Sequence, residues 1–128
     1  MEISVHDNQI LSYSVFSDKR EIRFHTVFMD ELIDVIFSEV FIYHFEGDNF
    51  KTIIFDIYEV ELEEIYNDYE ELFLKLKNYN WINRNFETKD DLLEVMKREK
   101  IKAYNFHSSF GLSGWIWAKN MERVKINT

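Results

Sequence analysis

The chain has 128 residues, of which 46% are hydrophobic and 17% aromatic, and a formal net charge of −9. A chain of this size and composition buries enough apolar surface to fold, so we expect one globular domain over residues 1–128 and not a disordered segment. It contains no cysteine, which excludes disulfides and thiolate chemistry. We see no leader and no apolar run of membrane-spanning length, and therefore expect a soluble, cytoplasmic protein.

The first half of the sequence predicts antiparallel strands. Apolar and polar residues alternate over residues 10–16 and 22–28, and a polar turn at 17–19 separates the two runs, as in a hairpin. Residues 33–45 are apolar on both parities, which indicates either a strand buried on both faces or a bulge near Ser38 and Glu39. A turn at 46–49 then leads to a fourth strand over 51–60.

The periodicity changes to that of a helix at Glu61. We predict an amphipathic helix over 61–77, ending at 78–80, and a second one that begins after Thr88, a favourable N-cap. Two further apolar runs, 101–110 and 115–126, flank a glycine turn at 111–114 and predict a last hairpin. The fold class is therefore α+β, an antiparallel sheet of about six strands. Two helices are inserted between strand 4 and the C-terminal hairpin and pack on one face.

No motif in the sequence predicts catalysis, a metal or a cofactor. The four histidines, His6, His25, His44 and His107, show no ligand spacing, so we expect separate surface or core residues. The alternative is that the sheet brings His25, His44 and His107 together. Asp56 lies in an apolar strand, where it faces outward or binds a backbone amide, or else serves as an acid–base carboxylate. Ser113 between two glycines lacks the pattern of a nucleophile elbow, and a simple turn explains it, with a ligand or peptide contact as the alternative.

One stretch of the chain concentrates negative charge. Residues 52–74 contain eight carboxylates and no lysine or arginine, whereas the other 105 residues carry 16 acids against 15 bases. On a helical wheel the acids fall opposite the apolar stripe, with an apolar Leu74 among them. The candidate protein-binding residues are Glu63, Asn67, Asp68, Glu70, Glu71 and Leu74. The alternative is a solvated face with one exposed leucine.

The charge distribution indicates the kind of partner. A field of one sign steers a basic protein and repels nucleic acid, and the scattered lysines and arginines form no nucleic-acid footprint. Residues 1–74 carry 18 acids and four bases, while residues 75–128 carry six acids and 11 bases, so we expect the two parts to attract each other. We therefore expect a basic protein partner, and neither nucleic acid nor membrane.

The sequence resembles small acidic bacterial proteins encoded beside polymorphic toxins, many of which are immunity proteins. The resembling parts are the His6-Asp7 pair before a strand, the run at 53–60 and the segment 108–115. The resemblance implies inhibition of a toxin by binding, without catalysis or cofactor. Several families of this size are known only as domains of unknown function, and membership of one of them is equally compatible with the sequence.

Two other classes of function remain open from the sequence. One is a small enzyme or ligand-binding domain with a pocket lined by aromatic residues and histidine, which would require converging polar groups and perturbed titration. The other is a structural protein that forms homodimers through an open sheet edge. The acidic helix favours a non-catalytic binding protein over both.

Overall fold

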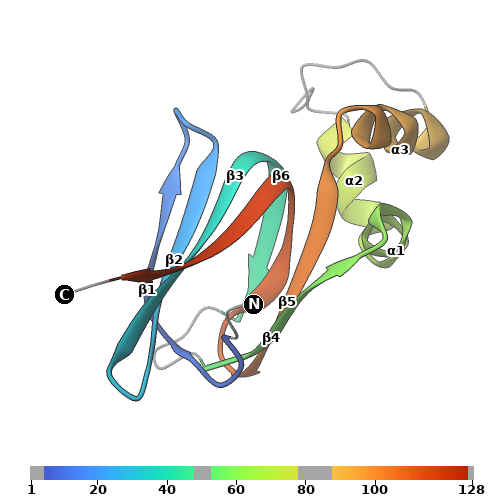
Figure 1. The fold of residues 1–128 in the computed structure, drawn as a ribbon. Coiled ribbons are helices and arrows are strands. Elements are labelled where there is room, and N and C mark those ends of the chain that lie inside the picture. Colours follow the sequence, from blue (N-terminus) through green and yellow to red (C-terminus); the bar gives the residue numbers. More distant parts are fainter. Residues whose placement is uncertain (1–4, 48–52, 78–87, 127–128) are drawn as a thin grey trace.

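The computed structural model describes residues 5–47, 53–77 and 88–126. Three helices lie between the fourth and fifth of six strands, which confirms the predicted α+β class (Figure 1). The elements are β1 (Gln9–Phe16), β2 (Glu21–Phe28), β3 (Glu31–Glu46), β4 (Ile53–Val60), α1 (Leu62–Asp68), α2 (Glu70–Lys77), α3 (Lys89–Arg98), β5 (Lys102–Phe110) and β6 (Ser113–Ile126).

The strands form an antiparallel barrel in the order β1-β2-β3-β6-β5-β4. The pairing between β1 and β4 that closes it is short: Gln9 faces Ile53, and Ile54 exchanges backbone hydrogen bonds of 2.8 Å with Asp7 and Asn8. Farther along β4, the Arg123 guanidinium of β6 donates to the carbonyl oxygen of Ile57 at 3.0 Å. A side chain therefore assists closure where the backbone ladder does not reach.

Two hydrophobic cores use opposite faces of the same strands. The first fills the barrel, where Phe24 contacts the rings of Tyr13, Phe37, Phe45 and Phe106 at centroid distances of 5.4–6.0 Å. The second lies between the three helices and the strands that they cover, around the fully buried Trp115 and Trp117. The helices thus pack on one side of the barrel, as Figure 1 shows.

Strand β3 bends near its middle (Figure 1). Its pairing with β6 shifts register between Val40 and Ile42, and Glu39 has a φ of 52°. This confirms a bulge, next to the predicted position, where an extra residue bends the strand. The first half of β3 pairs with both β2 and β6. Among the described strands, the second half continues in a ladder with β6, and one further bond joins the Val40 amide to the Arg20 carbonyl.

The helix predicted over 61–77 is two helices, α1 and α2, which meet at Tyr69. This residue leaves helical geometry (φ −122°, ψ 31°), although its N–H still bonds to the Ile65 carbonyl at 3.0 Å. Its ring lies 5.2 Å from His44 and 5.5 Å from Trp115, and its hydroxyl donates to Glu46 at 2.7 Å. These contacts with distant parts of the chain accompany a break that helix periodicity does not indicate.

Other predicted boundaries agree with the structure or lie outside it. Thr88 caps α3 by accepting a hydrogen bond from the Asp91 amide at 3.1 Å, as predicted. Three predicted features lie partly or wholly outside the described residues: the end of the first helix at 78–80, residues 48 and 49 of the turn, and residues 51 and 52 of the fourth strand. Within the described ranges, none of the helices has the length and apolar character needed to cross a membrane.

Candidate functional site: the acidic surface of α1 and α2

The helices α1 and α2 are amphipathic, and this determines which side chains they present. Leu62, Ile65, Tyr66 and Phe73 are buried against the barrel. The opposite side consists of exposed side chains, which we call the acidic surface: Glu63, Glu64, Asn67, Asp68, Glu70, Glu71 and Leu74. All six residues singled out from the sequence are therefore exposed, with Glu64 in addition.

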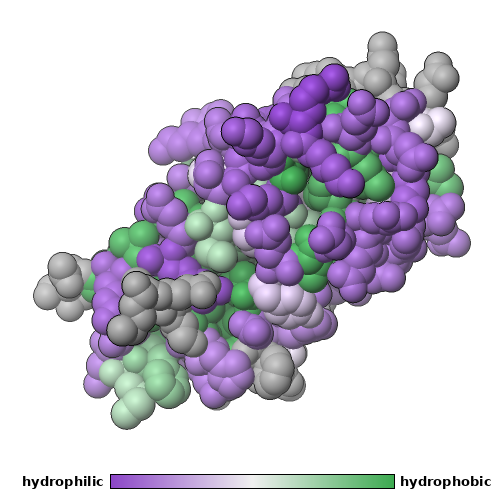
Figure 2. Space-filling view, turned by 45° about the vertical axis from the view of Figure 1, so that its right-hand side comes forward, coloured by the Kyte–Doolittle hydropathy of each residue, from purple (hydrophilic) through white to green (hydrophobic). Residues whose placement is uncertain are grey.

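Five of the six predicted residues also line one hollow, which we call the acidic hollow. Its volume is about 640 Å³, and its lining includes Asn67, Asp68, Glu70, Glu71 and Leu74, together with Tyr69 and Leu72. Leu74 is 48% exposed, so an apolar side chain is surrounded by carboxylates. Glu63 is not among the lining residues of this hollow. In Figure 2 hydrophilic residues cover much of the visible face and surround separate hydrophobic areas.

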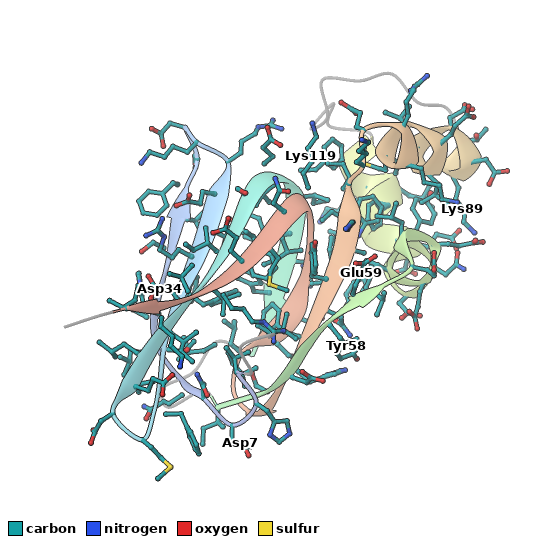
Figure 3. The ribbon with its side chains drawn as sticks, viewed as in Figure 1. Asp7, Asp34, Tyr58, Glu59, Lys89 and Lys119 are labelled. Carbon is teal, nitrogen blue, oxygen red and sulfur yellow. The ribbon has the colours of Figure 1, made fainter. Side chains whose placement is uncertain are left out.

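One member of the acidic surface is already paired. Lys89 at the start of α3 lies close to α1 (Figure 3), and its ammonium donates to Glu63 at 2.8 Å. This hydrogen bond and the charge of Lys89 lower the pKa of the Glu63 carboxyl, and the same bond raises the pKa of Lys89. In the described part of the chain, no lysine or arginine lies within ion-pair distance of Asp68, Glu70 or Glu71.

Other ion pairs join the acidic and basic parts of the sequence. Besides Lys89 and Glu63, Lys119 lies 3.8 Å from Glu39 and Lys125 lies 3.1 Å from Glu31. Each pair joins a base after residue 74 to an acid before it, so the predicted attraction between the two parts is confirmed. The acidic hollow retains its negative charge in spite of these pairs.

Tyr69 connects the acidic surface to the barrel. Its phenol, half-buried beside Trp115, donates to Glu46 of β3. Burial and then this hydrogen bond raise the pKa of Tyr69 to about 12, because the phenolate would lose solvent and face a carboxylate. The neutral phenol therefore stabilises the junction of α1 and α2 against the barrel.

We expect Tyr69→Phe to change the stability at high pH. Because the folded-state pKa lies above the ordinary value of 10, the contribution of Tyr69 is complete below pH 10 and is lost as the pH rises towards 12. In denaturant unfolding between pH 8 and about pH 11.5, the wild-type protein should lose more stability than Tyr69→Phe. Tyr58→Phe, at an exposed position of β4, should behave like the wild type. Equal slopes for Tyr69→Phe and the wild type would contradict the assignment.

The histidines do not converge. His6 lies 3.0 Å from Asp7, His25 lies 3.0 Å from the nearly buried Asp34, and His44 lies 3.5 Å from Glu46. The ring of His107 lies 5.8 Å from that of Tyr58, in a tilted arrangement. Among the residues that the structure describes, no three histidines or carboxylates are placed to hold a metal ion.

Asp56 and the glycine turn have structural explanations. The Asp56 carboxylate accepts a hydrogen bond from the Ile57 amide at 2.8 Å, which is one of its two expected arrangements. Gly111 has a φ of 96°, so a glycine is required in the turn between β5 and β6, as predicted. Neither Asp56 nor Ser113 is among the lining residues of the described hollows.

A second concave feature escaped the sequence analysis. An apolar groove of about 430 Å³ lies between the end of the β1–β2 hairpin, the second half of β3 and Leu72 of α2. Five consecutive residues of β3, Val40–His44, line it. The only indication of the groove in the sequence is the hydrophobicity of these residues, and a strand buried in the core has the same hydrophobicity.

The acidic surface and this groove are the two candidate binding features, and Leu72 lines both. Their geometry suits contact with another molecule: concave, partly apolar and charged at one side. Comparisons of the chain with protein-family models, with curated proteins and with solved structures returned no match.

Proposed function

We propose that this protein is a non-catalytic binding protein that captures a basic protein through the acidic surface of α1 and α2. The role that fits best is that of a cytoplasmic immunity-type inhibitor, which blocks a basic toxin by covering it. In this proposal Asp68, Glu70 and Glu71 attract the partner and form ion pairs at the rim, and Leu74 supplies an apolar contact at the centre.

The observation that carries the proposal is the exposed, uncompensated charge around Leu74. Like charges four residues apart on a helix destabilise it by a few tenths of a kcal/mol, as do crowded neighbouring carboxylates. A surface selected only for solubility would intersperse lysine among them. An apolar residue inside a charged rim is the arrangement of a protein–protein contact.

The charge also predicts how association depends on salt. The Debye length is about 10 Å at 0.1 M ionic strength and about 3 Å at 1 M, so exposed charges act over a short range in concentrated salt. A partner steered by the acidic surface should therefore associate more slowly as salt rises, with a smaller effect on dissociation. Glu63 should contribute less than Glu70 or Glu71, because Lys89 already neutralises it.

We expect charge reversal of the hollow to abolish capture of the partner. The test variant is Asp68→Lys/Glu70→Lys/Glu71→Lys, and the matched control is Glu59→Lys/Glu94→Lys/Glu122→Lys, with the same change in net charge at exposed sites elsewhere. Each protein is immobilised and exposed to host lysate at low and high salt, and bound proteins are identified by mass spectrometry. Basic proteins retained by the wild type and the control at low salt should be lost from the test variant.

The product of the neighbouring gene provides the functional arm of this test. If it is a toxin, co-expression with the wild type or the control should protect cells, and co-expression with the test variant should not. If the three substitutions of the test variant leave capture of the partner unchanged, the acidic surface is not the binding site. Protection that requires catalytic turnover of a small molecule would favour the enzyme class.

A further inference from the structure

From Ile42 to Phe45, strand β3 pairs on one side only with a strand of the described part of the chain. Within the described residues, β2 pairs with β3 only from Glu31 to Phe37, and a single bond from the Val40 amide to the Arg20 carbonyl at 2.8 Å follows. From Ile42 to Phe45, β3 pairs with β6 on its other side. Alternate N–H and C=O groups of an antiparallel strand point to each side, so this stretch presents backbone donors and acceptors on the side away from β6, where Ile42, Tyr43 and His44 line the groove.

The walls of the groove suit an extended chain. Val15 and Tyr43 are 40% and 41% exposed, and Phe16, Ile22 and Leu72 also line the groove. Such an edge is a template for an added strand, whose main chain binds the ladder while alternate side chains enter apolar pockets. A compact ligand without a main chain would leave those backbone groups unused.

The neighbouring charge gives the added strand a direction. His44 and Leu72 lie at the end of the groove next to Tyr69, and Leu72 also lines the acidic hollow. Since β3 runs from Val40 towards His44, an antiparallel strand would start at the acidic end. A basic residue at its N-terminal end would then lie near Glu70 and Glu71.

We propose that the partner binds by adding an extended segment, basic at its N-terminal end and then alternately apolar, to the edge of β3 between Ile42 and Phe45 that no other described strand occupies. This inference rests on the proposed function, since it names the part of the basic partner that is recognised. The acidic surface supplies attraction and orientation, and the edge of β3 supplies the main-chain hydrogen bonds.

The probe is a short synthetic peptide in which two lysines precede alternating valines and threonines, residues that favour strands. Peptide control one is N-methylated at alternate residues, which removes the N–H groups of one edge. Peptide control two carries two glutamates in place of the lysines. Binding to the full-length protein is measured by calorimetry, and hydrogen exchange of the β3 amides is followed by NMR.

We expect the probe to bind and to slow the exchange of amides within residues 42–45. N-methylation should weaken binding at least about tenfold, equivalent to roughly 1.4 kcal/mol. Val15→Lys in the groove should weaken it similarly, while Leu11→Lys, on the same strand and 55% exposed but outside the groove lining, should not. The double variant Glu70→Lys/Glu71→Lys should weaken binding of the peptide with two lysines, and should not weaken binding of the control peptide with two glutamates.

Three results would overturn strand addition: no binding at millimolar peptide, equal binding of the N-methylated peptide, or protection confined to amides away from β3. After any of these results, the lysate capture experiment would still test the acidic surface as a binding site. Conversely, strand addition that persists when charge reversal has no effect on capture would refute the proposed function and retain the edge as a peptide site.

Discussion

Gly114→Ala is expected to destabilise the protein by about 3 kcal/mol or more, a large value for one methyl group. Gly114 has a φ of 157° and pairs with Phe45 in the ladder between β3 and β6. A Cβ at this position would overlap the His44 carbonyl oxygen and lie 3.0 Å from the Phe45 Cα. Both atoms belong to the backbone, so no side-chain rotation relieves the clash and the two strands must separate.

The free energies of unfolding of Gly114→Ala and of the control variant Ser113→Ala are measured in urea. Ser113 is the preceding residue and pairs with Glu46 in the same ladder, so its replacement tests the site without adding a clash. We expect Ser113→Ala to change the free energy of unfolding by no more than about 0.5 kcal/mol. Equal stability of the two variants would mean that β3 and β6 separate here at little cost. Because the backbone of His44 and Phe45 would shift, Gly114→Ala should also weaken binding of the probe peptide.

The local pattern of the sequence was sufficient for the strands and for the class of fold. Alternation placed the first hairpin, and the change of period at Glu61 placed the start of the helical part, because both signals depend on neighbouring residues. Closure of the barrel was not predictable in the same way. It depends on contacts such as that of Arg123 with Ile57, 66 residues apart, which no local period encodes.

The acidic surface could be predicted because a helical wheel needs only local spacing. The break at Tyr69 could not, since its partners Glu46 and Trp115 are distant in sequence. The groove was missed for a related reason. Its lining joins the β1–β2 hairpin, β3 and α2, and the residues Val40–His44 look like core because the strand is apolar on both faces.

Phe73→Ala is expected to cost about 3–5 kcal/mol, as truncation of a buried phenylalanine does in a well-packed core. Phe73 is 1% exposed, and its ring stacks on Tyr66 at 4.8 Å and on Trp115 at 5.6 Å, and lies 5.0 Å from Trp117. The cavity would lie between α2 and the barrel. Because the rigid aromatic neighbours fill it poorly, the loss should fall near the upper part of this range.

Leu74→Ala provides the matched control, since it removes a similar apolar side chain one residue later from the exposed side of α2. It should change stability by only about 0.5 kcal/mol, yet weaken capture of the partner, whereas Phe73→Ala should weaken both. Unfolding free energies and capture are measured on the same preparations. If Phe73→Ala leaves the stability within about 1 kcal/mol of the wild type, α2 does not unfold cooperatively with the barrel, and the acidic surface is not held rigidly by the core beneath it.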